Sequence, residues 1–184
     1  MAISGFPEVL PAQRFAEQEV LDRLRATFEL HGFAPLETPA VESLDQLTRK
    51  GEIEKEVYVL RRLHADAEEA GDSGAELGLH FDLTVPFARF VLEYAGRLEF
   101  PFRRYQIQKV WRGERPQNGR YREFTQADID VIARDELAFH HDVEIARVMA
   151  EALSALEFLP QLLLSDPLPL DLLECDDAGC RAPQ

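Results

Sequence analysis

The sequence predicts an α/β (α+β) domain built on a mainly antiparallel sheet that is flanked by helices. Three segments have apolar residues at helical spacing, and two long strand-type runs follow one another near the middle of the chain. The chain has 184 residues, of which 46% are hydrophobic and 29% charged, so it is long enough and apolar enough for one globular core. This composition excludes a wholly disordered chain, a collagen-like repeat and a coiled coil.

The first predicted helix spans residues 12–31. Ala16, Val20, Leu24 and Phe28 recur every four residues, and Gly32 follows where a helix commonly ends. The next ten residues contain two prolines, which indicate an extended segment at a sheet edge.

A short helix is predicted over residues 84–95. Pro86 lies in its first turn, where a missing N–H costs little, and either Asp82 or Thr84 is suited to cap it. Two strands are expected before it, at 57–63 and 77–81, on either side of a turn-rich stretch.

The last predicted helix spans residues 136–158, with Asp135 as its N-cap. Beyond it the sequence is rich in proline and has no steady period. We therefore expect a domain over residues 1–159 and an atypical tail over 160–184.

The charge of the chain is unevenly distributed. The formal net charge is −14, yet residues 102–126 contain 7 basic and 2 acidic side chains. Such a basic island suits a small anionic ligand, such as a nucleotide, better than a long duplex. No apolar run approaches the ~20 residues that span a bilayer, and the N-terminus does not have the pattern of a signal peptide, so we expect a cytoplasmic protein.

The two long strands, 103–112 and 122–132, are joined by nine residues, more than a tight hairpin needs. Because strand side chains alternate between faces, pairing would give one apolar face and one polar face. The polar face is expected to have arginines near the loop and carboxylates at its far end. Its residues are Arg104, Gln106, Gln108 and Arg112 on one strand and Phe124, Gln126, Asp128 and Asp130 on the other.

This polar face has two interpretations. It is either a solvated sheet surface or a site for a ligand with an anionic end and a donor-bearing end. On the second interpretation Arg112 binds a phosphate or carboxylate, Phe124 stacks on a flat ring, and Gln126 and Asp130 accept hydrogen bonds. We expect no metal site in the protein, because the adjacent His140 and His141 diverge on a helix.

Four segments resemble the histidyl-tRNA synthetase family of class II aminoacyl-tRNA synthetases. VWRGERPQNGRYREFTQADIDVI resembles motif 2, and LHFDLTVPFARF resembles the histidine-binding segment. GFPEVLP resembles the N-terminal signature of the family, and HGFAPLETPAVE resembles motif 1. The resemblance runs from about residue 5 to about residue 159 and implies the class II fold.

The resemblance also implies roles for individual residues. Arg112 would be catalytic, bridging the α-phosphate of ATP and the histidine carboxylate. ATP would contact Arg112, Glu114, Arg120 and Phe124. Histidine would contact Asp82, Thr84, Arg112, Gln126 and Asp130. The implied cofactor is Mg²⁺, held on the phosphates. The implied partners are histidine, ATP, tRNA and a second copy of the chain, in which case helix 12–31 would contribute to the dimer interface.

The sequence departs from the family in two ways. His80 stands where arginine is usual, and the family's later motifs and anticodon-binding domain are not found, so the chain resembles the N-terminal part of a catalytic domain, apparently truncated. We therefore expect the chain alone to lack full aminoacylation activity. Two alternatives remain open: a non-ligating histidine-binding paralogue, such as the regulatory subunit of ATP phosphoribosyltransferase, and an inactive dimerising fragment.

Overall fold

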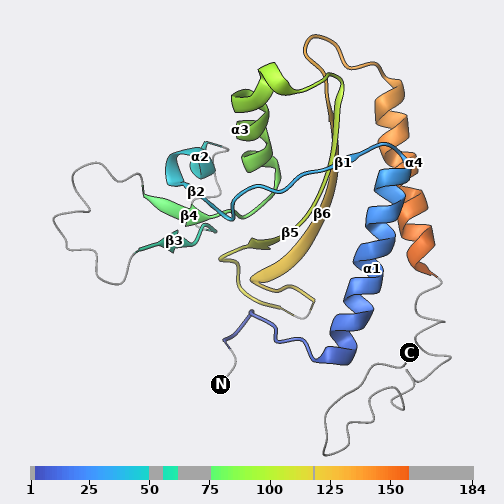
Figure 1. Cartoon of the computed structure of the whole chain (residues 1–184). Coiled ribbons are helices and arrows are strands. Elements are labelled where there is room, and N and C mark those ends of the chain that lie inside the picture. Colours follow the sequence, from blue (N-terminus) through green and yellow to red (C-terminus); the bar gives the residue numbers. More distant parts are fainter. Residues whose placement is uncertain (1–2, 50–55, 62–75, 118, 158–184) are drawn as a thin grey trace, which may run out of the picture.

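A computed structural model describes residues 3–49, 56–61, 76–117 and 119–157 of the chain (Figure 1). Its helices and strands follow one another in the order α1 Pro11–Leu30, β1 Ala34–Pro35, β2 Val41–Ser43, α2 Leu44–Thr48, β3 Val59–Leu60, β4 Leu77–Leu79, α3 Thr84–Tyr94, η2 Ala95–Arg97, β5 Phe102–Trp111, β6 Glu123–Ile132 and α4 His140–Glu157. None of the described helices is long and apolar enough to cross a membrane.

The long hairpin of β5 and β6 is the centre of the fold. Each strand has ten residues, and the two pair antiparallel from Phe102 opposite Ile132 to Trp111 opposite Glu123. β1 joins the free edge of β5 as a short parallel strand. The predicted strands were therefore placed within one residue of their observed ends, and the predicted antiparallel character of the sheet is confirmed.

One face of the hairpin forms the main core. The side chains that alternate toward this face pack against α1 and α4, which lie on the same side of the sheet (Figure 1). The cluster centres on Phe28, Phe33, Tyr105, Val148 and Ala152, with Ile107, Ala127, Ile129 and Val131 of the strands against it. The predicted apolar face is thus buried by the first and last predicted helices.

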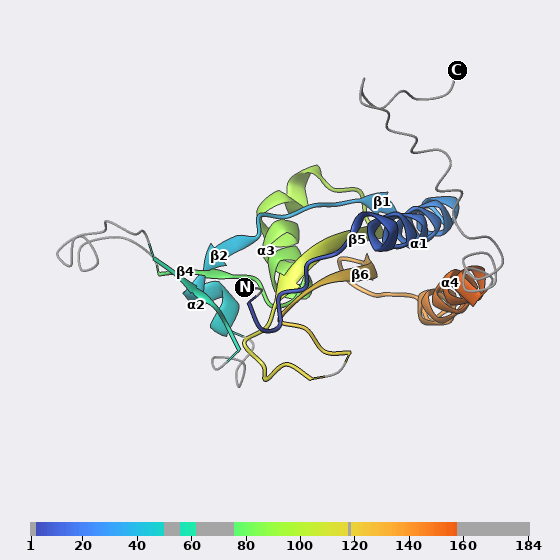
Figure 2. The same cartoon turned by 90° about the horizontal axis from the view of Figure 1, so that it is seen from below.

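The opposite face of the hairpin is covered at one end by α3. The Phe87 ring lies 6.2 Å from that of Phe102, and the Arg104 guanidinium lies over Phe87. Beyond α3, β2 and β3 pair with the two edges of β4 in a small antiparallel sheet next to α2 (Figure 2). The polar face of the hairpin is therefore enclosed by protein along part of its length.

Three predicted elements have bounds that differ by more than one residue from those observed. The strand expected at 77–81 ends at Leu79. The last helix begins at His140 and not at 136, and Asp135 does not cap it. Residues 133–139 are used instead to cross from the end of β6 to α4, where Leu137 and Phe139 remain 40% and 77% exposed. The strand expected at 57–63 is only Val59–Leu60 among the described residues, and its predicted end lies outside them, as does the tail 160–184.

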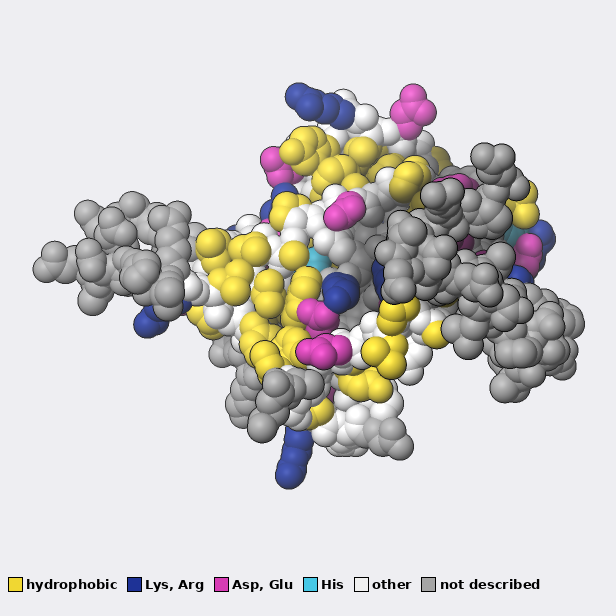
Figure 3. All heavy atoms as spheres, turned by 60° about the horizontal axis from the view of Figure 1, so that its bottom comes forward, with side chains coloured by type: hydrophobic (Ala, Val, Ile, Leu, Met, Phe, Trp, Pro, Cys, Tyr) yellow, Lys and Arg dark blue, Asp and Glu magenta, His cyan; other side chains and the backbone are white. Residues whose placement is uncertain are grey.

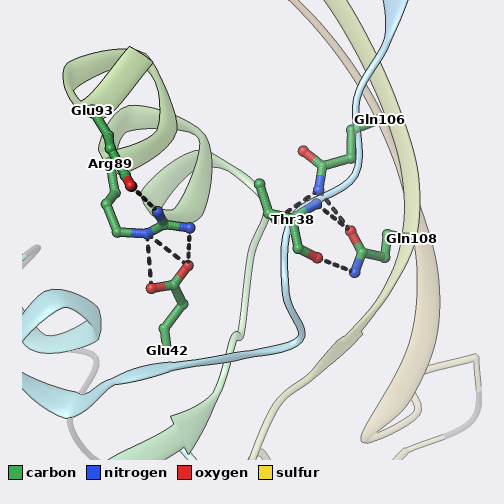
Figure 4. Close-up of polar contacts among 6 residues, drawn as sticks. All are labelled: Thr38, Glu42, Arg89, Glu93, Gln106 and Gln108. Atoms are coloured by element: carbon green, nitrogen blue, oxygen red, sulfur yellow. Dashed lines mark hydrogen bonds and ion pairs between the residues drawn. The ribbon is translucent and has the colours of Figure 1, made fainter. Parts of the chain in front are cut away.

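A largely buried ion pair ties the small sheet to α3. Arg89 donates from Nε and Nη2 to the Glu42 carboxylate at 2.7–2.9 Å, and the Glu42 side chain is only 7% exposed (Figure 4). Glu42 raises the pKa of Arg89 by hydrogen bonding to its guanidinium. Arg89 also contacts Glu93 at 2.8 Å, but the Glu93 side chain is 54% exposed.

Replacing Glu42 with alanine is expected to lower the free energy of unfolding by about 2 kcal/mol, because the half-buried Arg89 guanidinium loses its main partner. Glu93→Ala is the matched control, since it removes an exposed partner of the same arginine, and it is expected to cost less than about 0.5 kcal/mol. Urea unfolding of both variants measures the difference. Equal losses in the two variants would contradict the importance of burial here.

A second polar link joins α1 to α4 across the edge of β5. Arg103 donates to both oxygens of Glu144 at 2.7 and 2.9 Å and to the carbonyl of His31 at 2.8 Å. Its guanidinium also lies 4.5 Å from the ring centre of Phe33. The hydrogen bond from Arg103 lowers the pKa of Glu144 from its ordinary 4.5 to about 2, with His141 adding a smaller effect in the same direction.

This pKa predicts a specific dependence of stability on pH. Because the pKa of Glu144 is lower in the folded chain, its stabilising effect is complete above pH 4.5 and is lost as the pH falls toward 2. Glu144→Gln should therefore lower the free energy of unfolding by about 1 kcal/mol at pH 7 and have little effect near pH 2. Asp45→Asn, in the exposed pair with Arg49, is the control and should change little at either pH. A loss in Glu144→Gln that is the same at both values of pH would overturn this account.

Candidate active site

Arg112 is held by contacts with three parts of the chain. It follows the last residue of β5, and its backbone N–H donates to the carbonyl of Arg122 at 2.8 Å. Its Nε donates to the Phe81 carbonyl at 3.1 Å, and its Nη2 donates to Gln126 Oε1 at 3.2 Å. The guanidinium also lies over the Phe124 ring, 5.0 Å from its centre. A side chain fixed in this way presents a charge at a defined place, since little conformational freedom remains to be lost on binding.

A pocket of about 330 Å³ opens beside this guanidinium. Its lining consists of Arg112, Glu114, Gly119, Arg120, Tyr121 and Phe124. The four residues that the resemblance assigned to ATP therefore all line one pocket, although Phe124 lies on β6 and the other three lie in the connection between β5 and β6. Arg120 Nη1 lies 3.8 Å from Glu114 Oε2, and the Arg120 side chain is 71% exposed. Two guanidinium groups and aromatic rings in one cavity suit an anion attached to a flat ring system.

The segment before α3 lies alongside the end of β5. The carbonyl of His80 accepts a hydrogen bond from the Trp111 N–H at 3.1 Å, and Phe81 contacts Arg112 as described above. This contact brings Asp82 and Thr84 to the same end of the hairpin. Leu83 is the N-cap of α3, so neither predicted residue is the cap itself. Asp82 is buried, and its Oδ1 accepts the Val85 N–H of the first helical turn at 3.1 Å. Thr84 is exposed at the start of α3.

His80 is completely buried in the position where the resemblance leads one to expect arginine. Its Nε2 lies 2.7 Å from the carbonyl of Lys109, and its ring packs on Trp111 with 5.5 Å between centres. Nδ1 is buried and has no hydrogen-bond partner among the described residues. His80 therefore acts as a packing group that links the 80–84 segment to β5.

Gln126 continues the polar contacts from Arg112 toward the acidic end of the site. Its Nε2 donates to Asp128 Oδ2 at 2.8 Å. Two residues further along β6, Asp130 lies opposite Arg104, and Asp130 Oδ2 is 2.5 Å from Arg104 Nη2. The five residues predicted to contact histidine thus lie on adjoining segments: Arg112 and the 80–84 segment at one end, and Gln126 and Asp130 along β6.

The expectation that arginines lie near the loop and carboxylates at the far end is wrong for Arg104. The hairpin register puts Arg104 opposite Asp130, at the acidic end and away from the loop. Burial raises the pKa of Asp130, and the neighbouring Arg104 opposes that rise. Burial in turn lowers the pKa of Arg104, opposed by Asp130, Asp128 and Asp82.

The two glutamines of β5 do not contribute to an open ligand site. Gln108 Nε2 donates to the Thr38 carbonyl at 2.7 Å, and Gln106 Nε2 donates to the Thr38 hydroxyl at 2.9 Å (Figure 4). Gln106 is also completely buried. These side chains hold the extended segment after β1, so the polar face is partly structural.

Sequence reasoning missed the role of the N-terminal segment in positioning the loop. The carbonyl of Gly5 accepts the backbone N–H of Arg122 at 2.7 Å and that of Glu123 at 3.3 Å. Arg122 Nε in turn donates to the carbonyl of Glu114 at 3.0 Å. The one feature of the sequence that indicates this contact is the glycine at position 5, because the backbone there has a φ of +86°, which favours glycine.

No group of three or more histidine, cysteine or acidic side chains suited to hold a metal ion is present in the described part of the chain. The site combines a pocket lined by two arginines with a neighbouring polar strand face that carries carboxylates.

Comparison with known proteins identifies the family. A sequence model described as Histidyl-tRNA synthetase matches residues 5–170. The chain belongs to the histidyl-tRNA synthetase family. It is 66% identical over 154 residues to a histidine–tRNA ligase of Cutibacterium acnes, a match that covers 84% of this chain and 34% of that protein. The chain thus spans about a third of the length of the curated relatives it matches.

Solved structures of this family have the same fold. The crystal structure of histidyl-tRNA synthetase from Nostoc sp. PCC 7120 superimposes with a TM-score of 0.72 at 38% identity, covering 85% of this chain and 34% of that one. A Bacillus halodurans protein described as an ATP phosphoribosyltransferase regulatory subunit/histidyl-tRNA synthetase has a TM-score of 0.69 at 22% identity over 84% of this chain and 37% of its own. At that identity the second likeness shows the fold alone. The predicted class II fold is therefore confirmed.

The contact between Gly5 and Arg122 predicts the effect of a small substitution. A Cβ at Gly5 would lie 2.8 Å from Arg122 Cγ, and alanine is disfavoured at a φ of +86°. Gly5→Ala is expected to cost about 1–2 kcal/mol of stability and to shift amide NMR signals of residues 113–123. Gly96→Ala is the control, because Gly96 has an ordinary φ and no atom within 4 Å of its added Cβ. Unchanged loop signals in Gly5→Ala would contradict the proposed contact.

Proposed function

We propose that this chain provides the ATP- and histidine-binding part of a histidine–tRNA ligase. The observation that carries the proposal is the pocket in which Arg112, Glu114, Arg120 and Phe124 meet. Arg112 is the central residue because it lines this pocket and also donates a hydrogen bond to Gln126 on the polar face of the hairpin. Membership of the histidyl-tRNA synthetase family supports the same assignment.

The first reaction would join histidine to AMP. A carboxylate oxygen of histidine attacks the α-phosphorus of ATP, a new O–P bond forms, and the bond to pyrophosphate breaks. The carboxylate is already ionised at neutral pH, so no general base is needed. Arg112 would contact both the α-phosphate and the attacking carboxylate and would stabilise the negative charge of the transition state.

The remaining pocket residues would orient ATP. Phe124 offers a ring for the adenine, and Arg120 at the open side offers charge to the terminal phosphates. Mg²⁺ usually binds through substrate phosphates and one or two carboxylates, and Glu114 is the carboxylate that lines this pocket. When bound, the ion would offset phosphate charge.

The polar face next to this pocket would bind histidine. Asp82, Thr84 and Gln126 would hold the α-amino group and the main-chain atoms. Asp130 would accept a hydrogen bond from an imidazole N–H at the far end. The second reaction would transfer the histidyl group to tRNA. This second reaction belongs to the whole ligase. The relative from Cutibacterium acnes is about three times as long as the part of it that matches this chain.

A homodimer is part of the proposal. α1 contributes Phe28 to the core, yet Phe15 and Leu30 on the same helix are 61% and 78% exposed. Figure 3 shows further hydrophobic side chains gathered on one face of the chain, next to charged side chains of both signs. A second copy is the occupant that the family suggests for such surfaces, and sedimentation would measure it.

The pocket lined by Arg112 and Phe124 argues against the alternative that this chain only binds histidine as a regulator. A regulator that binds histidine has no need of Glu114, Arg120 and Phe124 around one cavity. Stabilisation of the chain by histidine alone, with no effect of ATP, would favour the regulatory alternative. Stabilisation by neither would favour an inactive dimerising fragment.

Titration calorimetry with Mg²⁺–ATP tests the pocket directly. Arg112→Ala and Arg120→Ala are each expected to weaken ATP binding by about tenfold or more, because each removes a charge-assisted contact to phosphate. Arg115→Ala is the matched control. Arg115 is an exposed arginine of the same loop that does not line the pocket, and its removal should change affinity by less than about twofold.

Two results would contradict this proposal. An equal loss of affinity in all three variants would mean that ATP is attracted only by the general positive charge of the loop. No binding of ATP to the folded wild-type chain would mean that this pocket is not sufficient as a nucleotide site. Histidine-dependent exchange between ATP and pyrophosphate, lost in Arg112→Ala, would extend the proposal from binding to chemistry.

A further inference from the structure

Arg104 is the largest completely buried side chain of the described residues, and the mechanism above does not use it. Its Nη2 lies 2.5 Å from Asp130 Oδ2. All three of its guanidinium nitrogens, Nη2 included, are buried and make no hydrogen bond among the described residues, so the contact with Asp130 is an ion pair alone. The flat guanidinium lies 4.2 Å from the ring centre of Phe87 on α3, so it is enclosed between that helix and the sheet.

A buried guanidinium is costly unless opposite charges surround it. The charged groups that act on Arg104 are Asp130 and Asp128 of β6 and Asp82 at the start of α3. Arginine stays protonated under all ordinary conditions, so Arg104 supplies a permanent positive charge at the acidic end of the polar face. It acts there on carboxylates from two separate elements.

Asp130 is the member of this group that both touches Arg104 and is accessible. Its side chain is 37% exposed, whereas that of Arg104 is 0% exposed. One carboxylate oxygen is therefore engaged by a buried cation while the group as a whole still reaches the open side. An ionised carboxylate only accepts hydrogen bonds, whereas a protonated one also donates.

We propose that Arg104 is a positioning residue that determines specificity for the amino acid side chain. It favours the ionised form of Asp130 and holds one of its oxygens in an ion pair, so that the accessible oxygen selects a substrate whose side chain has an N–H donor. This inference rests on the proposed function, because it assigns Asp130 to the side-chain end of the histidine site. Arg104 acts through Asp130 and does not itself touch the substrate.

The first test measures Asp130 without any substrate. The titration of its carboxyl carbon is followed by NMR in the full chain, with Asp130→Asn to assign the signal. Removing Arg104 leaves Asp130 half-buried beside Asp128, so Arg104→Met should raise the midpoint by about one pH unit or more. Arg104→Gln should do the same and is a second variant if Arg104→Met does not fold. Arg97→Met, at an exposed arginine on η2, should leave the midpoint unchanged. An unchanged midpoint in a folded Arg104 variant would overturn the proposal.

The second test compares two ligands by calorimetry at pH 7. L-Histidine has a ring N–H, while β-(2-thienyl)-L-alanine has a flat five-membered ring without one. The wild-type chain should bind histidine about tenfold or more tightly than the analogue, and Arg104→Met should reduce this preference to about threefold or less. A role in folding alone would weaken both ligands equally and leave the preference intact, which would overturn the proposal.

The two tests separate this proposal from the function on which it rests. If the wild-type chain binds neither ligand, the proposed histidine site fails for this chain. The effect of Arg104 on Asp130 would still be decided by the titration. If histidine binds and the titration midpoint does not move, the function stands and the role of Arg104 is wrong.

Discussion

The register of the β5–β6 hairpin is the constraint on which the rest of the structure depends. Because side chains alternate along both strands, one register puts Tyr105, Ile107 and Ile129 toward α1 and α4. The same register puts Arg104 opposite Asp130 on the other face. A shift of one residue would bury the charged set in the main core and expose the apolar set. Core packing and site geometry are therefore fixed by the same ten residue pairs.

The polar face of this hairpin has a structural part and a part next to the pocket, and the two lie at different positions along the strands. In the middle, the glutamines of β5 hydrogen-bond Thr38 and hold the chain after β1 against the sheet. Near the loop, Arg112 and Gln126 hold each other next to the open pocket. The middle of the face is therefore closed by protein contacts, although Gln106 Oε1 stays buried without a hydrogen-bond partner among the described residues.

Much of this arrangement could be predicted from the sequence, because strand alternation and hairpin pairing are local rules. They were sufficient for the two long strands and for their two faces. The sequence alone did not show that Arg104 lies at the acidic end, since its place depends on register and not on composition. The start of the last helix was also missed, because the apolar residues 137 and 139 suit a helix but are needed to cross between layers. The contact of Gly5 with Arg122 joins residues more than a hundred positions apart, and no local pattern encodes it.

The number of basic residues in the segment 102–126 does not by itself show how many of them can bind an anion. Most of its seven cations have partners within the chain. Arg103 pairs with Glu144, Arg104 with Asp130, and Lys109 with Glu123, while Arg122 donates to the Glu114 carbonyl. Arg112 and Arg120 are the two that line the pocket. The electrostatic attraction for an anion therefore comes from two placed guanidinium groups more than from the net charge of the segment. A small, specific anionic ligand is what such a pair can recognise, whereas a long polyanion needs a row of exposed cations.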